Sequence, residues 1–305
     1  MTVDRSIRTG RFVAVQPGIR LHCAEAGDPA SPPLLLLHGF PEFWYAWRDL
    51  LPRFADRWHA IAPDLRGFNL SSRPADVQAY RVPQLVADLD GLIRGLGHER
   101  VAIVAHDWGG VVAWALAIAM PHRVSRLVIV NAPHPVPFAR ALASDPDQQA
   151  ASAYMNWLRR PGAEAALARD DFSLMERFFV GPSVPAWFDA PTRAAYHAAW
   201  GQTGALAGSL AYYRASPLHP PTADAPGAAG LELAPERFLV RVPTLVVWGE
   251  QDRALLPGLL EGLDAVVPEL TVARLPECSH WVAHEAPERL AALVNAFAAG
   301  APGPP

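Results

Sequence analysis

Residues 101–110, VAIVAHDWGG, carry the clearest chemical pattern in the chain. An apolar run that turns sharply into a helix forms a nucleophile elbow, which presents one reactive side chain at the tip of the turn. Here the tip is Asp107, and it is flanked by the small residues Ala105, Gly109 and Gly110, which let a strand and a helix approach closely. Ala105 stands where the usual pattern has a glycine. The alternative is an ordinary turn in which Asp107 caps the helix.

Two further residues could complete a hydrolytic site with Asp107. Asp252 follows the apolar run at residues 244–248, and His280 follows the run at residues 270–273. A nucleophile needs a histidine that accepts a proton, and that histidine needs an acid that orients it. Each of the three residues comes just after its own predicted strand, so all three could meet at one edge of a parallel sheet. Nucleophile, acid and histidine also follow one another in a known chain order for such triads.

The turn at residues 37–41, LHGFP, could supply the remaining part of such a site. It ends an earlier apolar run, so its backbone N–H groups could face the elbow. Together, the N–H groups of Phe40 and Trp108 would form an oxyanion hole, which stabilises negative charge on an intermediate.

The elements that position these residues alternate between apolar runs and helical patterns such as residues 44–57, 83–95 and 287–298. Runs without polar alternation predict a mostly parallel sheet that helices cover on both faces, which is an α/β fold. The runs are residues 34–37, 60–62, 101–104, 127–130, 244–248 and 270–273. Between residues 135 and 239 the alternation stops, and aromatic-rich helical stretches replace it. We therefore expect a core of residues 1–134 and 240–305 with an inserted, mostly helical cap (lid) at residues 135–239.

Composition excludes several classes of protein. All 26 cationic residues are arginines, so the chain has no lysine for a P-loop, for a kinase or for a Schiff base. The two cysteines, Cys23 and Cys278, cannot build a Cys-rich zinc site or a disulfide framework. A net charge of −4 leaves no basic surface for nucleic acid. We expect no cofactor, no metal and no nucleic-acid partner.

The N-terminal residues MTVDRS contain no apolar leader, and the longest apolar stretch, residues 109–120, is too short to span a bilayer. These features predict a cytoplasmic protein without a membrane span. The sequence contains no signal for an oligomeric state.

Several segments resemble the α/β-hydrolase superfamily and, within it, the soluble epoxide hydrolases, which are related to the haloalkane dehalogenases. They are HGFPEFWYAWR at 38–48, DLRGFNLSSRP at 64–74, HDWGG at 106–110, NAPHP at 131–135, WGEQD at 248–252 and SHW at 279–281. The resemblance covers most of the core and implies the α/β-hydrolase fold. The family also carries two cap tyrosines that donate hydrogen bonds to the epoxide oxygen. Tyr154 is similar to the first and Tyr213 to the second, with the adjacent Tyr212 as its competitor.

The resemblance implies a reaction in two steps. Asp107 attacks an epoxide carbon and forms a covalent alkyl ester, while the two tyrosines stabilise the alkoxide. His280, oriented by Asp252, then activates a water that hydrolyses the ester and releases a vicinal diol. The implied partners are a small, apolar, uncharged epoxide and water. A serine nucleophile would form an ether that water could not cleave, so Asp107 argues against an esterase, a lipase or a peptidase.

Three alternatives remain. Haloalkane dehalogenases share the aspartate nucleophile, and Trp108 is similar to one of their halide donors; however, their common second donor, an asparagine, is replaced here by Phe40. Some of them place the acid at the position of Asn131. Fluoroacetate dehalogenases have an arginine where this chain has Trp108. Finally, some proteins of this fold bind ligands without catalysis, although they often lack a catalytic residue that this chain retains. We therefore predict an epoxide hydrolase.

Overall fold

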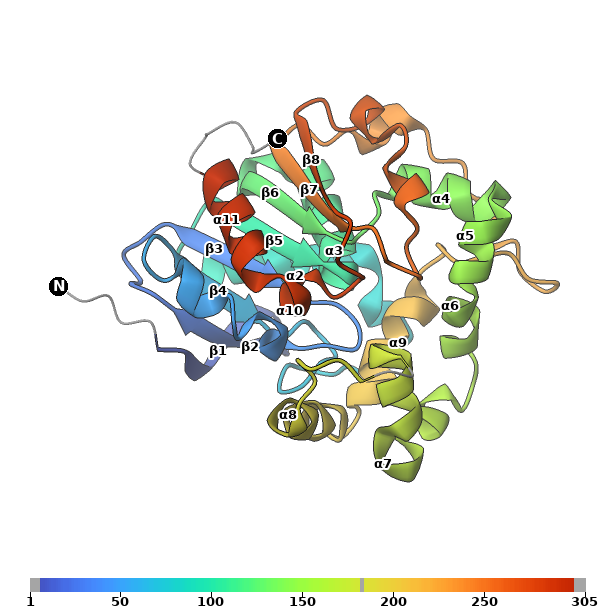
Figure 1. The fold of residues 1–305 in the computed structure, drawn as a ribbon, viewed down its shortest axis with the longest axis horizontal. Helices are drawn as coiled ribbons and strands as arrows, with labels where there is room; N and C mark the ends of the chain where they lie inside the picture. The colour runs from blue at the N-terminus through green and yellow to red at the C-terminus, as the bar shows by residue number, and fades with distance from the viewer. Residues whose placement is uncertain (1–5, 182–183, 299–305) are drawn as a thin grey trace.

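One mixed sheet forms the centre of the computed structural model, which describes residues 6–181 and 184–298. The strand order is β1-β2-β4-β3-β5-β6-β7-β8 (Figure 1). β1 and β2 form an antiparallel hairpin, β2 pairs antiparallel with β4, and every later pairing is parallel. The strands are β1 Arg8–Gln16, β2 Ile19–Ala26, β3 Pro33–Leu37, β4 His59–Pro63, β5 Val101–His106, β6 Val124–Val130, β7 Thr244–Gly249 and β8 Leu270–Leu275. The prediction about an N-terminal leader includes residues 1–5, which lie outside the described residues.

The central strands are apolar on both sides because the sheet has a hydrophobic core on each face. In β3, Leu35 and Leu37 belong to one core, whereas Leu34 and Leu36 belong to the other. Successive side chains of a strand point to opposite faces, so a strand covered on both faces needs an unbroken apolar run. This is the pattern that the sequence shows at each parallel strand from β3 to β7.

Helices cover both faces. α2 (Val82–Gly95) and α3 (Asp107–Ala119) contribute to the first core, while α1 (Leu51–Phe54), α10 (Val282–Glu285) and α11 (Pro287–Ala298) contribute to the second. The prediction of one helix at residues 44–57 is wrong. The structure has a short turn, η1 (Trp44–Trp47), followed by α1, because Pro52 lacks the N–H that a continuous helix would bond to Arg48.

A group of helices is inserted between β6 and β7, within the predicted cap. They are α4 Pro135–Ser144, α5 Pro146–Ala151, α6 Ala153–Leu158, α7 Ala163–Val180, α8 Ala190–Trp200 and α9 Ala205–Ala215, followed by the turns η4 Gly227–Gly230 and η5 Pro235–Phe238. In Figure 1 these helices lie on the side of the molecule opposite α11. The remaining short turns are η2 Val77–Tyr80, η3 Pro121–Arg123, η6 Pro257–Leu260 and η7 Leu263–Ala265. That residues 135–239 are a domain of their own stays a prediction.

α9 is fixed to the core by a contact between two backbones. A Cβ atom on Gly208 would lie 2.7 Å from the carbonyl oxygen of Gly67, so only glycine fits at this crossing. Beside it, the buried Tyr212 hydroxyl donates a 2.7 Å hydrogen bond to the carbonyl of Arg66. The Arg66 guanidinium in turn makes two 2.6 Å hydrogen bonds to Asp88. These contacts of Gly208 and Tyr212 with the core fix the position of the next residue, Tyr213.

No helix within residues 6–181 and 184–298 is both long enough and apolar enough to cross a membrane.

Candidate active site

Asp107 lies at a sharp turn between β5 and α3. It is the first residue of α3 and has a φ of +48°, a left-handed conformation that aspartate tolerates better than most residues. The turn is tightly packed: a Cβ atom on Gly109 would lie 2.5 Å from the carbonyl oxygen of Leu37, and one on Gly39 would lie 2.1 Å from Oδ1 of Asp107. Ala105 fits fully buried in β5. The geometry is that of a nucleophile elbow.

The structure brings the three residues of the predicted triad together. Nδ1 of His280 lies 2.6 Å from Oδ2 of Asp252, and Nε2 lies 3.9 Å from Oδ2 of Asp107. Asp107 follows β5, Asp252 follows β7 and His280 follows β8, so the site forms at the carboxyl edge of the sheet. The other oxygen of Asp252 accepts hydrogen bonds of 2.8 and 2.9 Å from the N–H groups of Ala254 and Leu255.

Asn131 is a positioning residue that the sequence analysis did not assign. It follows β6, and its Nδ2 donates a 2.8 Å hydrogen bond to Oδ2 of Asp252. Its Oδ1 accepts a 2.8 Å hydrogen bond from the N–H of Gly249. The side chain therefore holds both the acid and the end of β7. The signal for this role in the sequence was a polar residue directly after an apolar run.

The charges around His280 determine its protonation. Burial disfavours the imidazolium, but the carboxylates of Asp252, Asp107 and Glu42 outweigh burial and raise the pKa of His280 to about 9. Burial likewise opposes the charge of Asp252, yet His280 and the hydrogen bonds from Leu255 and Asn131 lower the pKa of Asp252. At neutral pH the resting pair is therefore an imidazolium beside a carboxylate.

Glu42 is a second residue that sequence reasoning missed. Its buried carboxylate accepts hydrogen bonds from the hydroxyl of Tyr196 at 2.8 Å and from Nε2 of His284 at 2.6 Å. It also lies 3.2 Å from His106, whose Nε2 donates a 2.9 Å hydrogen bond to the carbonyl of His280. Although burial opposes its charge, the neighbouring His284 and His106 hold the pKa of Glu42 well below its usual value. A charged residue within the apolar segment FPEFW was the signal in the sequence.

Two phenols, Tyr154 and Tyr213, line the same cavity as Asp107. The Tyr213 ring centroid lies 5.2 Å from that of Trp108 and 6.2 Å from that of Tyr154. Burial, the neighbouring Tyr154 and the Asp107 carboxylate raise the pKa of Tyr213, and burial and the Asp107 carboxylate also raise the pKa of Tyr154. Both phenols therefore keep their protons and can donate hydrogen bonds. Tyr212 is the less suitable candidate, since its hydroxyl already donates to the core.

The predicted oxyanion hole is held by the turn after β3. The N–H of Phe40 donates a 2.6 Å hydrogen bond to Oδ1 of Asp107. His38 fixes this turn, because its Nε2 accepts from the N–H of Leu65 at 2.9 Å and its Nδ1 then donates to the carbonyl of Gly39 at 2.9 Å. Trp108 is the second residue of α3, where a backbone N–H has no partner within the helix. Its use as the second donor stays a prediction.

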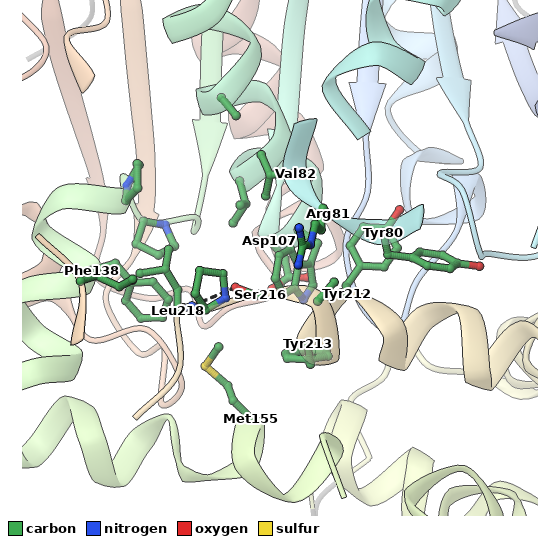
Figure 2. Close-up of a pocket in the computed structure, with 18 of the residues that line it drawn as sticks. Tyr80, Arg81, Val82, Asp107, Phe138, Met155, Tyr212, Tyr213, Ser216 and Leu218 are labelled. Carbon is green, nitrogen blue, oxygen red and sulfur yellow. Dashed lines mark hydrogen bonds between the residues drawn. The ribbon is translucent and has the colours of Figure 1, made fainter. Parts of the chain in front are cut away.

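A cavity of about 540 Å³ connects these groups to the space under the inserted helices (Figure 2). Asp107, Tyr154 and Tyr213 line it together with mostly apolar side chains, and Arg81 is the other charged residue of the lining within the described chain. A cavity of this size accommodates a small organic molecule. In the part of the chain that the structure describes, no cluster of three or more His, Cys, Asp or Glu residues could hold a metal.

A carboxylate in a nucleophile elbow, with an acid–histidine pair after later strands of a mostly parallel sheet, defines an α/β-hydrolase. The protein-family model described as "alpha/beta hydrolase fold" matches residues 32–287. The AB hydrolase superfamily protein YfhM of Bacillus subtilis is 35% identical over 280 residues, which are 91% of this chain and 92% of that protein.

Two solved structures are also similar. An epoxide hydrolase of Bacillus megaterium, in complex with an inhibitor, has a TM-score of 0.87 and is 32% identical, covering 95% of this chain and 100% of its own. An epoxide hydrolase from metagenomes of hot environments has a TM-score of 0.86 and is 39% identical, covering 97% and 99%. The chain therefore belongs to the α/β-hydrolase family and, within it, to the epoxide hydrolases.

Proposed function

We propose that the chain hydrolyses an epoxide to a vicinal diol through a covalent ester on Asp107. The observation that carries this proposal is the arrangement of one carboxylate and two protonated phenols, Tyr154 and Tyr213, in the lining of one apolar cavity. A carboxylate can open an epoxide only if the departing oxygen is stabilised, and the phenols supply that stabilisation.

In the first step, Oδ2 of Asp107 is the attacking atom, since Oδ1 accepts the hydrogen bond from Phe40. A carbon–oxygen bond forms between Oδ2 and one epoxide carbon, and the bond between that carbon and the ring oxygen breaks. The ring oxygen leaves as an alkoxide that the two phenols stabilise by hydrogen bonds. Because Asp107 is now an uncharged ester, the pKa of His280 falls, and the proton that His280 releases neutralises the alkoxide.

In the second step, neutral His280 accepts a proton from a water that attacks Cγ of Asp107. The oxyanion that forms at Oδ1 is stabilised by the N–H groups of Phe40 and Trp108. When the intermediate collapses, the departing diol oxygen takes the proton from His280, and the acid proton left on Asp107 returns to His280. Asp252 keeps the imidazole ring in the required orientation throughout.

A single turnover in H₂¹⁸O tests this route. We expect the label in the Asp107 side chain and not in the first diol released, because the water attacks Cγ while both diol oxygens come from the epoxide and from Asp107. Label in the first diol would show direct attack of water on the epoxide and would refute the ester mechanism. An Asp107→Ala variant should produce no diol.

The haloalkane dehalogenase alternative is tested with a panel of epoxides and 1-haloalkanes, with diol and halide measured separately. We expect diol formation; halide release without diol from any epoxide would favour the alternative.

We also propose, from the sequence alone, that the protein is cytoplasmic and that it has no nucleic-acid partner. Cell fractionation and a nucleic-acid binding assay test these two expectations.

A further inference from the structure

α3 carries a row of apolar side chains that other protein atoms leave partly uncovered. After Asp107 the helix contains no charged residue, and an apolar helix of this kind is normally covered on all sides. Most of its side chains are buried, but Val111, Ala115 and Ile118 are only half-buried. They are four and three residues apart, so they lie along one face of the helix. All three line the cavity that contains Asp107.

The row extends well beyond the reacting atoms. With a rise of about 1.5 Å per residue, Ala115 lies roughly 12 Å and Ile118 roughly 16 Å along the helix from Asp107. The facing walls are apolar as well: Val82 and Pro83 come from the first turn of α2, and Phe138 comes from α4. In Figure 2, Val82 and Phe138 lie on different sides of the cavity. The cavity therefore extends along α3 further than an epoxide ring requires, and we call this part of it the channel.

We propose that the face of α3 formed by Val111, Ala115 and Ile118 binds one long apolar substituent of the epoxide, which follows the helix from Asp107 for up to roughly 16 Å. This inference rests on the proposed epoxide hydrolysis and names the class of substrate. The face has no hydrogen-bonding side chain, so it selects by length and width. Arg81, the only cation of the lining among the described residues, is exposed, and water screens its charge.

A series of 1,2-epoxyalkanes, from epoxybutane to epoxytetradecane, tests the proposal in the unmodified protein. Burial of each added methylene group should raise kcat/KM by about 4-fold until the chain reaches the end of the channel, after which the rise should stop. Values of kcat/KM that do not depend on chain length would overturn the proposal.

Two substitutions locate the channel. Ala115→Phe places a ring in its middle, and we expect kcat/KM for epoxydodecane to fall at least about 10-fold more than kcat/KM for epoxybutane. Ile118→Trp fills the far end of the channel and should shorten the preferred alkyl chain of the substrate by fewer carbons than Ala115→Phe does. Ala119→Phe is the matched control, because Ala119 lies on the same helix but is exposed and outside the lining. An equal loss for both substrates in Ala115→Phe, with folding confirmed by circular dichroism, would refute the channel.

Binding of 1,2-alkanediols to the Asp107→Ala variant separates this inference from the proposed function. Calorimetry should give an affinity that rises with chain length even though this variant cannot turn over. If the diols bind in this way but the unmodified protein hydrolyses no epoxide, the proposed function fails while the channel stands. If short epoxides are hydrolysed but long diols bind no better than short ones, the channel fails while the proposed function stands.

Discussion

Removal of the negative charge of Asp107 should lower the pKa of His280. The proposed mechanism depends on this coupling, because His280 must be an imidazolium in the resting protein and a neutral base once Asp107 has become an ester. Burial opposes the charge of His280, and nearby carboxylates, including Asp107, raise its pKa to about 9. Asp107→Ala removes one of these charges permanently and so reproduces the electrostatic effect of the ester.

The magnitude follows from the distance of 3.9 Å between Nε2 of His280 and Oδ2 of Asp107. At this separation, two unit charges attract by about 4 kcal/mol at an effective dielectric constant of about 20, and by about 1 kcal/mol in water. Since one pKa unit corresponds to about 1.4 kcal/mol, the pKa of His280 should fall by roughly 1 to 3 units. Asp252 keeps its contact with His280, so part of the upward shift in the pKa of His280 remains.

NMR titration of ring-labelled histidines measures this shift. The chain has 11 histidines, and a His280→Gln variant identifies the signal of His280. Asp147→Asn, which removes an exposed charge on α5, is the control and should leave the pKa of His280 unchanged. An unchanged pKa of His280 in Asp107→Ala would refute the reasoning, because esterification could then not switch the histidine from acid to base.

Three further substitutions test residues that hold the site in place. Tyr212→Phe leaves the buried carbonyl of Arg66 without its donor, so urea denaturation should show a loss of about 1–3 kcal/mol in the free energy of unfolding; equal stability would contradict this. Asn131→Ala removes a hydrogen bond to the Asp252 carboxylate, worth about 1.5–3 kcal/mol, and should slow ester hydrolysis roughly 10- to 150-fold. Intact-protein mass spectrometry should then detect the ester, and a free protein mass during turnover would argue against it. Gly109→Val forces a Cβ atom to 2.5 Å from a carbonyl oxygen and should lower the free energy of unfolding by about 1–3 kcal/mol; an unchanged Tm would refute the close packing.

The predicted core of the fold came from local patterns, and its errors have local causes. The central parallel strands are buried on both faces, so each appears in the sequence as an unbroken apolar run. The hairpin of β1 and β2 was not predicted, because β1 is largely exposed and shows no such run. The helix predicted at residues 44–57 is replaced by the short turn η1 and the short helix α1, because Pro52 interrupts the backbone hydrogen bonds.

The candidate site, too, was predictable from the sequence only in part. Asp107, Asp252 and His280 could be proposed from the sequence because parallel strands all end at one edge of the sheet. The choice between Tyr212 and Tyr213 could not be made, since two adjacent residues differ only in what each hydroxyl meets. The Tyr212 hydroxyl donates to the carbonyl of Arg66, 146 residues away in the chain, whereas the phenol of Tyr213 is acted on by the charge of Asp107.

The α/β core and the inserted helices were predictable because apolar periodicity is a local pattern, and the order of the hydrolytic residues can be read directly along the chain. The groups that support these residues became visible only in the folded chain. Asn131 contacts Asp252 across 121 residues, and Glu42 contacts His284 across 242. The open face of α3 was equally hidden, because an apolar helix has the same sequence whether protein or a cavity covers it. Such contacts depend on the packing of distant segments, and no local pattern records them.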